Sequence, residues 1–115
     1  MRPMTGHKAG DIVLVDFGFS ESVGSKKRPA LIINSDNYNK SRQEMIIMAI
    51  TSNIERVLVG DTKIERWREA RLLYPSLVTG IIRTIKDNMI IQKLGVLSEQ
   101  DFKRVKDSLK KTIEF

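Results

Sequence analysis

Two short stretches of the sequence carry side chains that could bind a phosphate group. Residues 26–29 read Lys-Lys-Arg-Pro, and the planar guanidinium of Arg28 offers paired donors that match phosphate oxygens. The second stretch begins at Thr51 and Ser52, where two hydroxyls directly follow an apolar run. Each stretch also has an ordinary structural interpretation. Arg28 could be an exposed arginine at the start of an edge strand, and the hydroxyls could serve turns or caps.

Composition excludes most other catalytic chemistry. The chain has no cysteine, so it has no disulfide framework, thiolate metal site or cysteine nucleophile. It has one histidine, His7, to which we assign no role, and a single histidine cannot form a multi-histidine metal centre or an acid–base pair. No P-loop, dinucleotide fingerprint or nucleophile elbow occurs, and the acidic residues are scattered. We therefore expect no cofactor, and either metal-free catalysis or none.

The charge balance favours a polyanionic partner. The 115 residues include 20 Lys and Arg against 14 Asp and Glu, a net charge of +6. Such an excess suits nucleic acid, and a surplus of charge that serves solubility is the alternative. The length predicts a single domain over residues 1–115. The sequence shows no secretory signal and no apolar run near the ~20 residues that span a bilayer, so we expect a cytoplasmic protein without membrane contact.

Predicted strands position both phosphate-binding candidates. Residues 18–27 are rich in Ser, Glu, Gly and Lys and predict a loop, and residues 30–33 predict the strand that follows. Arg28 then lies where the loop enters that strand. Residues 44–51, EMIIMAIT, are apolar on both faces and predict a central strand with Thr51 at its end.

The rest of the chain predicts short strands and one helix. Further strands are expected over residues 12–17, 56–59, 72–79, 80–85 and 89–94, and residues 63–73 predict a short strand followed by a loop or helical turn. Residues 34–43 are polar and predict a loop or one short turn, and residues 86–88 predict a hairpin turn. Ser98 is a natural N-cap for a C-terminal helix with apolar residues on one face. This order predicts a small β-barrel or strongly curved sheet with a helix packed on it.

Seven segments in this order resemble the MazF/PemK family of toxin ribonucleases from bacterial toxin–antitoxin systems. They are GDIVLVDF at 10–17, KRPALII at 27–33, AITS at 49–52, REARLLYPSLV at 68–78, IRTI at 82–85, KLGVLS at 93–98 and the closing amphipathic helix. Each segment is weak evidence alone, but seven in register along nearly the whole chain are a specific match.

The resemblance implies a mainly β fold with a C-terminal helix, a small SH3-like β-barrel, in a two-fold homodimer. It implies metal-independent, sequence-specific cleavage of single-stranded RNA such as mRNA, which leaves a 2′,3′-cyclic phosphate and a 5′-hydroxyl. In many members a strand-entering arginine and a threonine after the central strand carry catalysis, and these fall on Arg28 and Thr51. The family's antitoxin inserts an acidic tail into the RNA groove, so a cognate acidic antitoxin is an expected partner.

Five further residues are candidates for substrate binding. We expect Lys26 and Lys27 to contact backbone phosphates, and Ser52 to hold substrate. Phe19 could stack a base or simply anchor its loop on the core, and Arg83 lies in the IRTI segment.

The chain departs from the family pattern in three places, one of which is the 18–27 loop, where it lacks the histidine that some relatives use. Gly80 and Ile81 stand where some members carry an acid and a glutamine, and Arg71 stands where many have glycine. The departure at Gly80 leaves two other hypotheses open. The chain could be a non-catalytic module that binds RNA or a protein such as DNA gyrase, or an interaction module whose groove is unused.

Overall fold

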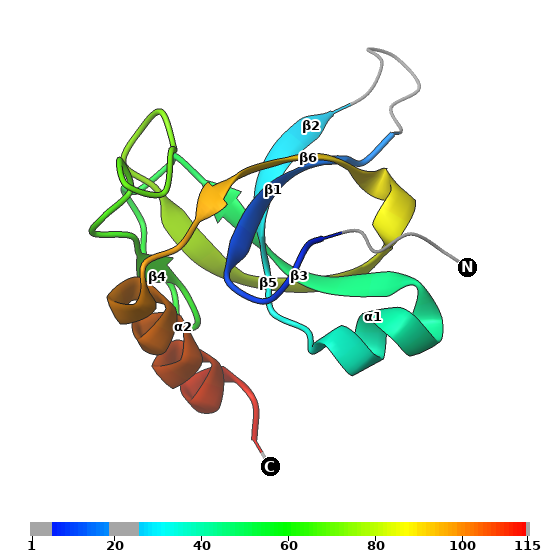
Figure 1. The fold of residues 1–115 in the computed structure, drawn as a ribbon. Helices are drawn as coiled ribbons and strands as arrows, with labels where there is room; N and C mark the ends of the chain where they lie inside the picture. The colour runs from blue at the N-terminus through cyan, green and yellow to red at the C-terminus, as the bar shows by residue number, and fades with distance from the viewer. Residues whose placement is uncertain (1–5, 19–25, 115) are drawn as a thin grey trace.

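The computed structural model describes residues 6–18 and 26–114. Within these residues six strands form one antiparallel sheet in the order β4-β5-β3-β2-β1-β6 (Figure 1). Their bounds are β1 Asp11–Asp16, β2 Lys27–Ile32, β3 Glu44–Thr51, β4 Thr62–Lys63, β5 Leu77–Lys86 and β6 Ile90–Val96. The strands predicted over 12–17, 30–33 and 44–51 correspond to β1, β2 and β3, and β2 begins early enough to contain Arg28.

The central strands are apolar on both faces because each face covers a different part of the core. Neighbouring residues alternate between two buried clusters: Ile12 and Leu31 belong to one, and Val13 and Ala30 belong to the other. β-strand side chains point alternately to the two faces, so the sheet has core on both sides. This explains why β1, β2 and β3 read as nearly continuous apolar runs rather than as a simple alternation.

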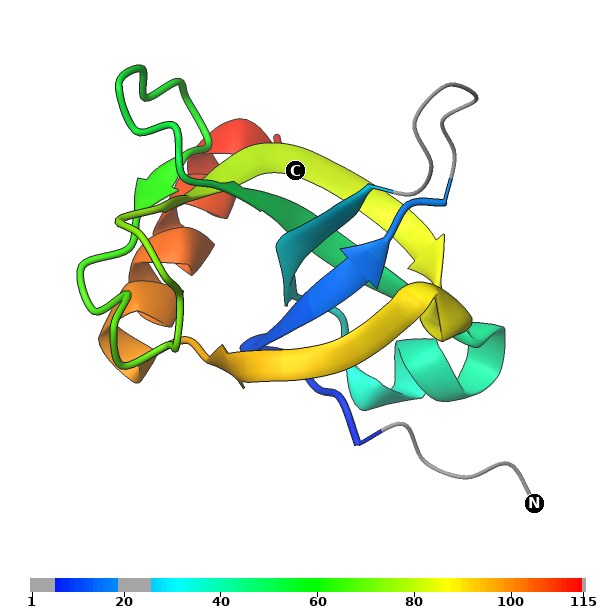
Figure 2. The ribbon, with the colours of Figure 1, turned by 90° about the horizontal axis from the view of Figure 1, so that it is seen from above.

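The sheet is strongly curved, as a small barrel requires, and its two edge strands are β4 and β6. Figure 2 shows β5 and β6 on opposite sides of the molecule, joined at one end by the short 3-10 turn η1, Asp87–Met89. The expectation of a hairpin across residues 86–88 is therefore wrong. β6 pairs with β1, and β5 pairs with β3 and β4. The turn residues mark a chain reversal, but they do not determine which strand the next segment joins.

The C-terminal helix α2, Glu99–Thr112, confirms the prediction from Ser98. The Ser98 hydroxyl accepts a hydrogen bond from the Asp101 backbone N–H at 3.1 Å, which satisfies one of the free donors at the helix N-terminus. Val105 is fully buried in the first core cluster, and Phe102 and Leu109 pack against it. None of the described helices is long and apolar enough to cross a membrane.

A second helix, α1 (Asp36–Arg42), replaces the loop or short turn expected over 34–43. Ser35 caps it by accepting the Tyr38 N–H, and Gln43 ends it in the left-handed conformation. Its one buried residue is Asn39, whose side-chain amide donates to the Glu44 carbonyl at 3.2 Å. The helix has no apolar stripe, and such a stripe is the pattern from which a helix is predicted.

Residues 56–59 form no strand, so the prediction there is also wrong. They lie in an exposed loop between β3 and β4, where Asp61 accepts the Leu58 N–H and donates its own N–H to the Leu58 carbonyl. Val57 and Val59 are 56% and 79% exposed. Three consecutive apolar residues predicted a short strand, but here they lie in a solvent-facing loop.

Candidate functional site

A groove opens at the end of the sheet where β2 and β3 separate. These strands pair through Ile32↔Ile47, Leu31↔Met48 and Ala30↔Ala49, and the pairing stops there although β2 extends back to Lys27 and β3 on to Thr51. The next position on β2 is Pro29, which has no N–H to donate to a neighbouring strand. Beyond the last pair, Arg28 is exposed and Thr51 is half-buried, whereas Ile50 stays in the core.

The groove has a volume of about 920 Å³. Its cationic lining comes from three segments of the chain and consists of Lys26, Arg28, Arg71 and Arg83. No carboxylate belongs to its described lining, and none of these four cations forms an ion pair with another described residue. Uncompensated cations around a concave surface attract an anionic ligand. Hydroxyls and an amide complete the polar lining, from Thr51, Ser52, Asn53, Ser76 and Thr79.

The structure brings together the two residues expected to carry catalysis. Arg28 is exposed on β2 and Thr51 is half-buried at the end of β3, and both line the groove. The Thr51 hydroxyl oxygen accepts the Asn53 N–H at 3.1 Å, so its proton is free to be donated to a ligand. The arrangement offers a guanidinium and a hydroxyl to one anionic group.

A bulge in β5 lies beside the end of β3 that carries Thr51. The pairing of β3 with β5 shifts between Met48 and Ile50, which interrupts the regular ladder. The Thr79 hydroxyl compensates by donating to the Ala49 carbonyl at 2.7 Å and accepting the Ile81 N–H at 3.2 Å. A groove-lining side chain thus holds the strand end that carries Thr51.

The five other sequence candidates have different outcomes. Lys26 and Ser52 line the groove, but Lys27 does not. Arg83 lines it too, and its guanidinium carbon lies 4.8 Å from the centre of the Phe17 ring. This stacking holds the arginine in place by a cation–π interaction and leaves its charge available. Phe19 lies outside the described residues.

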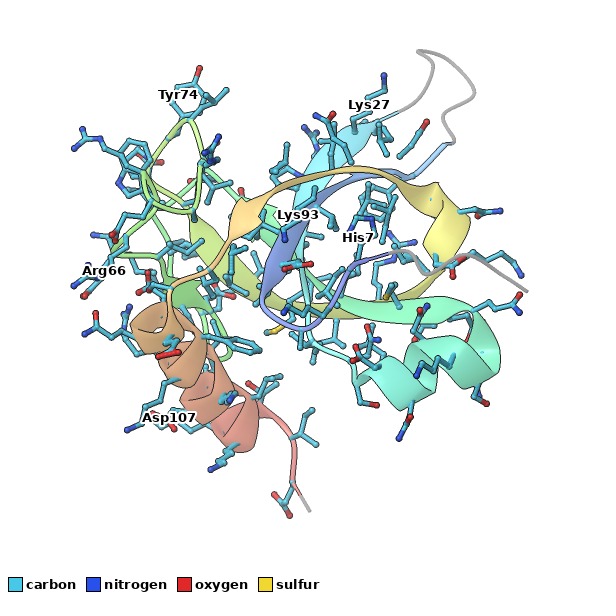
Figure 3. All side chains as sticks on the ribbon, viewed as in Figure 1. His7, Lys27, Arg66, Tyr74, Lys93 and Asp107 are labelled. Atoms are coloured by element: carbon cyan, nitrogen blue, oxygen red, sulfur yellow. The ribbon has the colours of Figure 1, made fainter. Side chains whose placement is uncertain are left out.

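Sequence reasoning missed the residues contributed by the loop over 64–76, between β4 and β5. The loop is closed at its base by a hydrogen bond from the Ile64 N–H to the Ser76 carbonyl, 2.9 Å long. It brings Arg71 and Tyr74 to the groove, and Figure 3 shows Tyr74 at the loop tip with its hydroxyl directed outward. Arg71 has a φ of 66°, which costs a non-glycine residue roughly 1–2 kcal/mol. The one available signal was Arg71 at a position where the family often has glycine.

Two contacts fix this loop against the rest of the molecule. Buried Asp101 on α2 accepts the backbone N–H groups of Glu65 and Arg66 at 3.2 and 2.9 Å. On the other side, a Cβ at Gly95 of β6 would lie 2.8 Å from the Ala70 carbonyl carbon. The backbone of the loop therefore rests directly on β6, and only glycine allows that approach.

The departure at Gly80 also has a structural explanation. A Cβ at this position would lie 3.2 to 3.3 Å from the backbone of Gly60, tighter than ordinary contact. The Gly80 N–H donates to the Asp61 carboxylate at 2.8 Å. Two backbone segments meet closely here, so any side chain at position 80 would require the Gly60 backbone to shift. Its neighbour Ile81 is 57% exposed and lines the groove.

The single histidine is not part of the groove. His7 precedes β1, and burial lowers its pKa, partly offset by the nearby Asp11 carboxylate. No cluster of three or more His, Cys, Asp or Glu side chains suited to a metal ion occurs in the described part of the chain.

Residues 8–113 match the family described as PemK-like, MazF-like toxins of type II toxin–antitoxin systems. The chain is 31% identical over 106 residues to the endoribonuclease MazF of Staphylococcus saprophyticus, covering 89% of this chain and 87% of that protein. The chain belongs to the PemK/MazF toxin family.

Solved structures agree with the fold. A mycobacterial endoribonuclease in complex with its cognate antitoxin superposes with a TM-score of 0.75 and 13% identity, covering 96% of this chain and 99% of that one. The MazE–MazF complex of Deinococcus radiodurans gives 0.74 and 17%, covering 92% and 94%. The predicted mainly β, barrel-like fold with a C-terminal helix is confirmed.

Proposed function

We propose that this chain is a toxin endoribonuclease that cleaves single-stranded RNA at short sequence motifs. The observation that carries the proposal is the groove at the parted ends of β2 and β3, with four cations and no carboxylate in its described lining. Family membership supports the activity, because the Staphylococcus saprophyticus relative is an endoribonuclease. RNA fits such a groove because its phosphates satisfy the cations and its unstacked bases can be read individually.

RNA supplies the nucleophile for this reaction. The 2′-hydroxyl attacks the adjacent phosphorus, a new P–O bond closes the 2′,3′-cyclic phosphate, and the bond to the 5′-oxygen breaks. The 2′-hydroxyl proton is lost, and the departing 5′-oxygen gains a proton to become a 5′-hydroxyl. The protein has only to orient these groups and stabilise the charge that develops on the phosphorane.

Arg28 and Thr51 divide this task. Arg28 binds the non-bridging phosphate oxygens and stabilises negative charge in the transition state, because its planar guanidinium offers paired donors to these oxygens. Thr51 donates its hydroxyl proton in a hydrogen bond to a phosphate oxygen or accepts one from the 2′-hydroxyl. Lys26 and Arg83 bind flanking phosphates, and Ser52 helps to hold the chain.

Cleavage in the presence of EDTA, followed by end-group mapping, tests this function. We expect cuts at discrete sites with cyclic-phosphate ends, because no step above uses a metal ion. Arg28→Ala should abolish cleavage without changing the circular dichroism spectrum, since the side chain is exposed. Arg56→Ala removes an exposed cation that does not line the groove and should cleave normally. Intact RNA across several long unrelated substrates, or equal cleavage by Arg28→Ala, would contradict the proposal.

A cognate antitoxin is the second partner we propose. The mycobacterial and Deinococcus radiodurans structures are both complexes with antitoxins. An acidic segment satisfies the same groove cations as RNA, so the two should compete. RNA cleavage should fall in proportion to the antitoxin added, and simultaneous binding of both ligands would contradict this competition.

We also propose that the chain acts in the cytoplasm as a homodimer. Among the described residues, the loop before β4 exposes Val57, Leu58 and Val59, each more than half exposed. Apolar surface of this kind is typical of protein interfaces. Light scattering at micromolar concentration should give twice the mass of the chain.

A further inference from the structure

The groove residues of the loop over 64–76 include a cation and an aromatic side chain that the reaction described above does not use. Arg71 and Tyr74 both line the groove, yet they come from a segment remote in sequence from Arg28 and Thr51. Arg71 is exposed and has no ion pair with any described residue, and Tyr74 is 63% exposed. A charged fork and an aromatic ring therefore face the groove without an internal partner in the described structure.

The conformation of Arg71 argues against an incidental position. Its φ of 66° is a backbone state that glycine adopts without strain and arginine does not. Strained backbone of this kind persists where the surrounding structure enforces it, and it is concentrated at binding sites. Two contacts hold the backbone of Arg71 in this conformation. The Arg71 N–H donates to the Arg68 carbonyl at 3.0 Å, and Gly95 lies against Ala70.

Tyr74 is held at the loop tip by a separate set of contacts. Its carbonyl accepts the Ser76 hydroxyl at 2.7 Å, while Leu72 on the Arg71 side packs against the first core cluster. The ring therefore sits on a fixed backbone although its side chain is exposed. An exposed ring that lines the same groove as an arginine is suited to stacking an unpaired base whose phosphate the arginine contacts.

We propose that Arg71 and Tyr74 form a nucleotide subsite for single-stranded RNA, separate from the scissile phosphate at Arg28. Arg71 contacts a phosphate and Tyr74 stacks a base. This inference rests on the proposed function and deepens it. The subsite increases affinity for RNA that extends beyond the cleavage point, and it has no part in the bond-breaking step.

Binding to fluorescent 2′-O-methyl RNA 20-mers of several unrelated sequences tests the subsite, because this RNA lacks the nucleophile and stays intact. Arg71→Gly removes the charge and the strain together. It should weaken binding to every sequence about tenfold. The slope of the logarithm of the binding constant against the logarithm of the salt concentration should become smaller by about 0.7. Its melting temperature should equal or exceed that of the parent chain. Arg68→Ala, which removes a cation from the same loop outside the groove, should leave both affinity and slope closer to the parent values.

Tyr74 is tested by the pair Tyr74→Ala and Tyr74→Phe. The first should weaken binding about tenfold, and the second should retain it because phenylalanine still stacks. If the parent chain binds these RNAs while Arg71→Gly and Tyr74→Ala bind equally well, the subsite is overturned and the proposed function stands. If the parent chain neither binds nor cleaves RNA, both proposals fall together.

Discussion

Arg28 and Thr51 occupy opposite positions on two neighbouring antiparallel strands that no longer pair. Extending the register Ala30↔Ala49 by two residues on each strand brings Arg28 opposite Thr51. Both side chains thus belong to the same face, at the level where the sheet has opened. The pairing of β2 with β3 aligns the two residues, and the end of that pairing at Ala30↔Ala49 leaves them accessible.

This relationship predicts distinct effects for two substitutions of Thr51. Thr51→Val removes the hydroxyl and should lower the single-turnover cleavage rate about 100-fold, as loss of one positioned donor does. Thr51→Ser keeps the hydroxyl and its hydrogen bond from the Asn53 N–H, so it should retain most activity. Single-turnover assays, with protein in excess over RNA, measure the cleavage rates of both variants. Equal rates for the valine and serine variants would show that the hydroxyl is dispensable.

Gly95 should be intolerant of even the smallest side chain. Gly95→Ala places a methyl group against the Ala70 carbonyl and should destabilise the fold by about 1–3 kcal/mol, as overpacking does. Urea unfolding measures the loss. The control is Val96→Ala on the same strand, where the side chain is half exposed and the change should stay within about 0.5 kcal/mol. An unchanged midpoint for Gly95→Ala would mean that the loop does not rest on β6.

Asp101 should stabilise the fold far more than other acids on α2. It is 1% exposed, accepts two loop N–H groups and is paired with Arg104 at 2.9 Å. Asp101→Asn removes the charge from these bonds and should cost about 2 kcal/mol. Asp107→Asn, on an exposed part of the same helix (Figure 3), is the matched control and should be nearly neutral. Similar losses from both variants would show that the contacts of Asp101 with the loop do not set its contribution.

His7 predicts a pH dependence of stability. Burial lowers the pKa of His7 below 6.5, the ordinary value for histidine. The unfolded chain therefore binds a proton at a higher pH than the folded one. The stability linked to this group is therefore present above pH 6.5 and is lost as the pH falls below it. Melting temperatures at pH 7.5 and 5.5 should differ more for the parent chain than for His7→Gln. Identical shifts would exclude His7 as the titrating group.

The elements best predicted from sequence were those whose local signals agreed with their tertiary environment. Residues 44–51 were identified with both ends correct, because a strand buried on both faces must be apolar throughout. Ser98 marked the beginning of α2 because its hydroxyl satisfies a helix donor. By contrast, α1 is held by polar contacts such as those of Asn39, which leave no periodic pattern.

The residues of the candidate site also fall into those that local sequence signals reveal and those that they do not. Arg28 and Thr51 could be found because each lies at the end of a recognisable strand. Arg71 and Tyr74 could not, because their loop is held in place by Asp101, some 30 residues further along the chain. Arg83 was named from its motif, but the ring of Phe17 that supports it comes from a different part of the sequence.

The attachment of the 64–76 loop to Asp101 sets an order of events during synthesis. The groove is lined by residues from Leu14 to Leu94, and the loop that forms one side is held by a side chain further on still. Long-range contacts of this kind form late, after the chain between them has been made. A nascent chain shorter than 101 residues therefore has Arg28 and Thr51 but lacks the side chain that holds the loop on one side of the groove.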